Sequence, residues 1–65
     1  MNKYIFYIRY LLFGDEVVDR LEVPCEVKSA TYDGALEKAL MQAQATVRAY
    51  EADGITAFFR IIKKS

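Results

Sequence analysis

Two neighbouring stretches of this sequence have matching strand patterns, and that match limits the fold more than any other feature. Residues 3–13 are crowded with tyrosine, isoleucine and phenylalanine, which favour β-strands. From Val17 to Lys28, apolar and polar side chains alternate with the period of a half-buried strand. Between them, Gly14-Asp15 suits a two-residue hairpin turn with glycine at the first central position. We therefore expect an antiparallel hairpin.

This turn predicts a register for the hairpin. If Phe13 pairs with Glu16, then Ile8 faces Leu21 and the apolar positions of the two strands share one side. A slip by one residue would place them on opposite sides of the sheet. The two patterns therefore agree in this register, or in one with a longer loop of the same parity.

A helix and a third strand are expected to follow. Thr31 is a candidate N-cap, and Asp33 in the first turn favours the helix dipole. Gly34 is a poor helix former and leaves the capping box incomplete, while Gly54 is the expected left-handed stop. Residues 55–63 then alternate as a strand does. The predicted apolar stripe of the helix comprises Tyr32, Leu36, Ala39, Leu40, Ala43, Val47 and Tyr50.

These patterns predict a single α+β domain over residues 1–65, with one helix on one face of a three-stranded antiparallel sheet in ββαβ order. One helix covers only one face of such a sheet. The first strand is apolar on both faces, which favours the central position and the strand order 2-1-3. The predicted inward residues of the sheet are Tyr4, Phe6, Ile8, Tyr10, Leu12, Val17, Leu21, Val23, Cys25, Val27, Phe59 and Ile61.

The chain is short for a domain without a covalent or metal staple. A domain of this size buries only about 60% of the surface that its unfolded chain exposes. Cys25 is the single cysteine and there is no histidine, so we expect no internal disulfide, no metal site and no cofactor. Because 54% of the residues are hydrophobic, the composition also excludes a disordered tail.

The sheet face turned away from the helix is the candidate functional site. Its expected content is too apolar for an idle solvated surface, and tyrosine, phenylalanine and arginine are the types enriched at binding hot spots. In the proposed register Arg9 opposes Arg20, which needs a carboxylate or anion between them, and Glu22 could supply it. The predicted partner-binding residues are Tyr7, Arg9, Leu11, Arg20, Phe58, Arg60 and Ile62.

The sequence offers little for catalysis, and we expect that the protein is not an enzyme. Cys25 lies on the inward side of its strand without a histidine to activate it, which predicts a buried structural thiol. The carboxylates of the turn and of the first helical turns are expected to lie in solvent rather than in a shared cleft. No glycine-rich phosphate loop and no Ser-His pair is present.

The sequence predicts a cytoplasmic protein that does not bind membranes. The apolar run from Tyr4 to Phe13 is about half of the roughly 20 residues that span a bilayer. A small-residue cleavage site, as in a secretory signal, does not follow this run. An unpaired cysteine is also what a reducing compartment permits.

A segment of the chain resembles part of a known family. The segment contains Glu22-Val23-Pro24, Ala30-Thr31, Asp33, Ala35-Leu36-Glu37 and Ala39, and it is similar to the small inhibitor of bacterial RNA polymerase made by short-tailed coliphages. The first strand departs from that family. The resemblance implies a strand-strand-helix-strand order and a phage protein that disables a host protein in the host cytoplasm, as some anti-CRISPR proteins do. We carry no polymerase-contacting residue over.

Three functions are open at this point. The first is a non-enzymatic, phage-type inhibitor that occludes the surface of an unidentified host protein. The second is a self-associating structural module in which the sheets of a homodimer pack face to face. The third is an anion- or nucleic-acid-binding module that uses Arg9, Arg20 and Arg60, with Tyr7 and Phe58 as stacking platforms. The zero net charge and the acidic neighbours on the face count against a nucleic acid.

Overall fold

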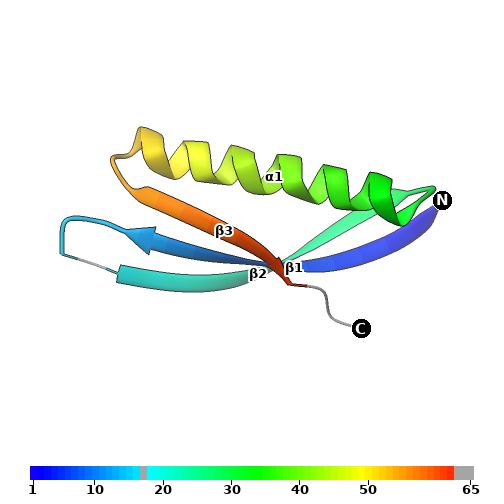
Figure 1. Cartoon of the computed structure of the whole chain (residues 1–65), viewed down its shortest axis with the longest axis horizontal. Coiled ribbons are helices and arrows are strands. Elements are labelled where there is room, and N and C mark those ends of the chain that lie inside the picture. Colours follow the sequence, from blue (N-terminus) through cyan, green and yellow to red (C-terminus); the bar gives the residue numbers. More distant parts are fainter. Residues whose placement is uncertain (17, 63–65) are drawn as a thin grey trace.

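The computed structural model describes residues 1–16 and 18–62 and contains three strands and one helix in this part of the chain (Figure 1). In chain order these are β1 (Asn2–Phe13), β2 (Val18–Ser29), α1 (Tyr32–Ala52) and β3 (Thr56–Ile62). The sheet is antiparallel with strand order β2-β1-β3, and α1 covers one of its faces. The structure thus confirms the predicted α+β fold and the central position of the first strand.

The hairpin register differs from the predicted one by two residues. β1 ends at Phe13 and β2 begins at Val18, and these two residues pair, so the connection has four residues instead of two. The predicted turn would need Gly14 in the left-handed region, whereas Gly54 is the one described residue with a positive φ. A shift of two residues keeps the same side chains on each face of the sheet. The structure therefore has the other predicted register, the one with a longer loop of the same parity.

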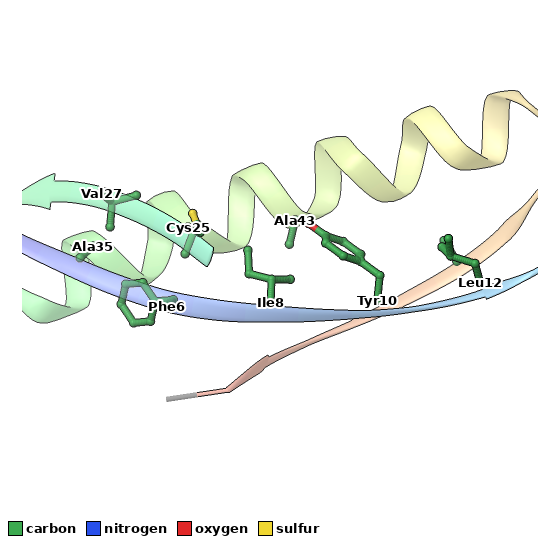
Figure 2. Close-up of a cluster of buried hydrophobic side chains, with 10 residues drawn as sticks. Phe6, Ile8, Tyr10, Leu12, Cys25, Val27, Ala35 and Ala43 are labelled. Carbon is green, nitrogen blue, oxygen red and sulfur yellow. The ribbon is translucent and has the colours of Figure 1, made fainter. Parts of the chain in front are cut away.

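The hydrophobic core lies between α1 and the inward sides of the strands. Ile8 and Tyr10 point from β1 toward the helix (Figure 2). The inward residues of the sheet are buried or partly buried as predicted, except Val17, which lies outside the described residues. The buried residues are Phe6, Ile8, Tyr10, Leu12, Cys25, Val27, Ala35, Ala39, Ala43 and Ala57.

The helix begins and ends where the sequence predicts. The Thr31 side chain accepts a hydrogen bond from a backbone N–H of the first turn, and it is the N-cap. At the other end, the N–H of Ile55 donates to the carbonyl of Tyr50 at 3.0 Å, and Gly54 between them has φ 81°. This arrangement is a Schellman motif, which satisfies the last carbonyls of the helix and turns the chain into β3.

The helix side that faces the sheet carries smaller residues than predicted. Ala35, Ala39 and Ala43 are fully buried at a spacing of four residues. The predicted stripe lacks Ala35 and includes Leu40, which is 38% exposed, so these parts of the prediction are wrong. Tyr32 is also 38% exposed, but its ring centroid lies 5.7 Å from that of the buried Phe6 and so contacts the sheet as predicted. Only methyl side chains fit where the helix lies closest to the sheet, and the larger residues lie on its flanks.

Candidate protein-binding face

Side chains on the sheet surface opposite α1 form the candidate site, which we call the outer face. Alternate residues of each strand point to it, because the residues between them face α1. Several apolar side chains on this face are in solvent: Ile5 is 49% exposed, Val18 69% and Phe58 58%. The outer face comprises Lys3, Ile5, Tyr7, Arg9, Leu11, Phe13, Val18, Arg20, Glu22, Pro24, Glu26, Lys28, Thr56, Phe58, Arg60 and Ile62.

All seven predicted partner-binding residues lie on the outer face, in three neighbouring rows across the sheet. Each row takes one residue from each strand. Pairing of β1 with both neighbours brings together side chains that lie up to 55 positions apart in the sequence, from Tyr7 to Ile62. Read from β2 through β1 to β3, the rows are Arg20–Leu11–Phe58, Glu22–Arg9–Arg60 and Pro24–Tyr7–Ile62.

A hollow of about 350 Å³ opens in the first two of these rows. Within the described part of the chain, the guanidinium groups of Arg20 and Arg60 have no acidic partner. The exposed ring of Phe58 lies in the same hollow, so cationic donors surround an aromatic surface. The hollow is lined by Arg9, Leu11, Arg20, Phe58, Phe59 and Arg60.

Arg9 has a carboxylate partner on this face. Its Nη2 lies 3.2 Å from Oε1 of Glu22, and both side chains are partly exposed. The predicted opposition of Arg9 and Arg20 is wrong, because the four-residue connection moves β2 by two residues and brings Glu22 opposite Arg9. The arginine that does lie opposite Arg9 is Arg60 of β3.

The outer face is positively charged although the whole chain has no formal net charge. Its acidic side chains, Glu22 and Glu26, each form an ion pair, with Arg9 and Lys3 respectively. The remaining three basic groups are not balanced on this face, which leaves a surplus of three positive charges: Arg20, Lys28 and Arg60. The compensating negative charge lies elsewhere on the molecule, so this face attracts acidic groups.

Phe13 belongs to the same patch, and the sequence-based list of site residues omits it. Its ring meets that of Phe58 edge to face, with the centroids 5.9 Å apart. The period of β1 could have identified it, because Phe13 has the same parity as Leu11. The contact holds the exposed Phe58 ring at one end of the hollow.

Cys25 lies on the other side of the sheet and takes no part in the outer face. Its side chain is buried, and Sγ donates to Oε1 of Gln42 on α1 at 2.6 Å. Burial raises the pKa of the Cys25 thiol above its ordinary value of 9.0. The thiol is therefore protonated at neutral pH and acts as a link between β2 and the helix.

A second hollow lies on one flank of α1, near its C-terminal end. It measures about 440 Å³ and is lined by Ala45, Thr46, Ala49, Tyr50 and Asp53. Its lining combines small side chains with one tyrosine and one carboxylate, and it lacks the arginines that line the hollow of the outer face.

Among residues 1–16 and 18–62, no group of three or more potential metal ligands comes together. The helix in this part of the chain is not long and apolar enough to cross a membrane.

No protein-family model matches the sequence, and no curated protein or solved structure gives a significant match. The resemblance of residues 22–39 to the coliphage inhibitor stays a prediction.

Proposed function

We propose that this chain is a small protein-binding module that docks its outer face on an acidic surface of another protein and inhibits that protein by covering it. The hollow around Phe58 carries the proposal. It combines an exposed aromatic ring with two arginines, Arg20 and Arg60, that have no acidic partner in the described residues. Aromatic residues and arginine dominate binding energy in protein interfaces, where a few side chains account for most of the affinity.

The charge of the outer face argues for a different protein rather than face-to-face packing of two copies. Packing two such faces together would bring two positive surpluses into contact, which costs several kcal/mol when like charges meet in an interface. A partner with carboxylates at the contact would instead pair with Arg20 and Arg60, and its apolar groups would cover Phe58. The homodimer with stacked sheets is therefore the weaker alternative.

A bacterial host protein is the partner that the resemblance of residues 22–39 to phage inhibitors favours. Inhibition by occlusion is supported by the outer face, an open sheet surface that can lie against another protein. A positively charged face with exposed Phe58 would also suit a nucleic acid. Retention of a protein partner, as opposed to salt-dependent binding to DNA or RNA, distinguishes the proposal from this third alternative.

The experiment is affinity capture from a bacterial lysate with the immobilised full-length chain, followed by binding measurements on the purified candidate partner. The site variant is Arg20→Glu with Leu11→Ala, and the matched control is Arg48→Glu on the exposed side of α1. We expect the site variant to bind the partner at least about 30-fold more weakly, as loss of a hot spot of 2 kcal/mol or more does. The control should bind as the wild type does.

Two results would contradict the proposal. One is a partner that binds the site variant and the wild type equally well, since the outer face would then not be the contact surface. The other is tight, strongly salt-dependent binding to DNA or RNA with no protein partner retained, which would assign the arginines to phosphate contacts instead. Circular dichroism on each variant checks that the fold is kept.

A further inference from the structure

The sheet has two edge strands, and they differ in how well they resist further pairing. β2 carries Pro24 near its middle, and proline cannot donate a ladder hydrogen bond. Charged side chains precede and follow it, at Arg20, Glu22, Glu26 and Lys28. Proline and charge are the usual means by which an edge strand avoids pairing with another chain.

β3 has neither protection. Its seven residues contain no proline and only one charged side chain, Arg60. Five of the seven are apolar: Ala57, Phe58, Phe59, Ile61 and Ile62. An exposed, apolar edge of this kind is a template for another strand. In the described part of the chain, β3 pairs with β1 alone.

We propose that β3 pairs antiparallel with β3 of a second copy, with the two-fold axis at Phe59, and so forms a continuous six-stranded sheet with both helices on the same side. Phe59 is the middle residue of β3, so this register pairs the strand over its whole length. It also places Arg60 opposite Phe58 of the second copy on the outer face, a favourable cation–π pair. An axis at Arg60 would instead oppose two guanidinium groups.

The helix offers a second surface for the same contact. Lys38 donates to the Lys28 carbonyl at 2.7 Å and Gln42 accepts from Cys25, so this flank of α1 lies over β2. The opposite flank, toward β3, carries Leu36, Leu40 and Val47, and Leu40 is 38% exposed. In the proposed pair, the two copies turn these flanks toward each other above the joined β3 strands, and the exposed leucine gains an apolar neighbour.

The single chain is more extended than a compact domain of its mass and length. Its accessible surface is 4837 Å², against about 4,250 Å² for a compact monomer of its mass. Its radius of gyration is 12.9 Å, against about 10.7 Å for a compact domain of its length. The surplus of roughly 600 Å² approaches the roughly 800 Å² that each partner buries in a stable interface. A second copy along β3 would account for this surplus.

The proposal is tested by the molar mass of the full chain in solution, measured by light scattering at concentrations from about 1 to 100 μM. We expect a dimer of twice 7.5 kDa for the wild type. Phe58→Lys places a lysine opposite Arg60 of the other copy, and the two-fold axis repeats this unfavourable pair. The dissociation constant of the dimer should therefore rise about tenfold or more. Phe58→Glu, at the same exposed position, offers a carboxylate to the same arginines and should remain dimeric.

The inference does not rest on the proposed function, and the variants keep the two apart. Arg20→Glu with Leu11→Ala alters β2 and β1, leaves every residue of β3 unchanged, and should leave the dimer intact. A wild-type chain that is monomeric at 100 μM overturns the inference. So does a dimer whose dissociation constant is the same for the wild type and for Phe58→Lys, because the proposed register places residue 58 at the contact.

Discussion

Gly34 lies in the first turn of α1, a position where its poor helix propensity should count against it. A Cβ atom added there would lie 2.6 Å from Oγ of Ser29 and 3.1 Å from Oγ1 of Thr31. Both oxygens are engaged, since Ser29 accepts from the Thr31 N–H and Thr31 accepts from the Gly34 N–H. The junction between β2 and α1 therefore closes on the space that the missing side chain leaves.

We predict that Gly34→Ala lowers the free energy of unfolding by about 1 kcal/mol, because the clash outweighs the gain of about 1 kcal/mol in helix propensity. In a Ser29→Ala background the nearest atom of residue 29 would be the Cβ, at 3.8 Å. There the same substitution should cost much less or stabilise the protein. Urea unfolding of the four proteins in this double-mutant cycle measures the difference. An equal cost in both backgrounds would contradict the explanation.

At the scale of the elements, the alanines of α1 set how closely the helix approaches the sheet. Ala35, Ala39 and Ala43 have no exposed surface and lie on one line along the helix. The apolar periodicity predicts which side of the helix is buried. Within that side, it favours large apolar residues over alanines as the most buried positions. The distance between the layers decides which positions are central, and that distance depends on residues of both layers.

We predict that Ala39→Leu destabilises the protein by about 1–3 kcal/mol, because the added atoms force the helix away from the sheet or into strained rotamers. Ala45→Leu is the matched control, since it makes the same change at an exposed position of the same helix. It should change stability by no more than about 0.5 kcal/mol. Thermal unfolding followed by circular dichroism compares them, and similar losses for both would indicate that the buried alanines are not tightly packed.

The hairpin shows a different limit of sequence reasoning. A period of two residues determines which side chains share a face, and the outer-face residues could be listed from it. It does not distinguish registers that differ by two, because both keep the same parity. The predicted ladder opposed Arg9 to Arg20, whereas the real one opposes Arg9 to Glu22, at an ion-pair distance of 3.2 Å.

For the whole molecule, a formal net charge of zero combines two sides of opposite charge. The outer face carries a surplus of three positive charges, while α1 is acidic at both ends, with Asp33 and Glu37 near its start and Glu51 and Asp53 near its end. The argument from net charge against anionic partners therefore loses its force once the sheet is assembled. The local field of one face, rather than the total charge, governs what approaches it.

We predict that the protein is retained on a cation-exchange resin at neutral pH and low salt, despite a formal net charge of zero. Arg20→Gln should elute at clearly lower salt than Arg48→Gln, although both remove one positive charge. The reason is that Arg20 belongs to the positive outer face and Arg48 to the exposed side of the helix. Equal elution of the two variants would show that the outer face does not act as a separate positive patch.

The amino-acid pattern alone determined the number and order of the elements, the central position of β1, the helix termini and the partition of strand residues between two faces. Each of these follows from local preferences or from the periodicity of one segment. The tertiary structure decided the two-residue offset of the hairpin, the line of alanines under α1, the Arg9–Glu22 pair and the separation of charge between faces. These depend on distances between segments that are remote in sequence, which no single segment contains.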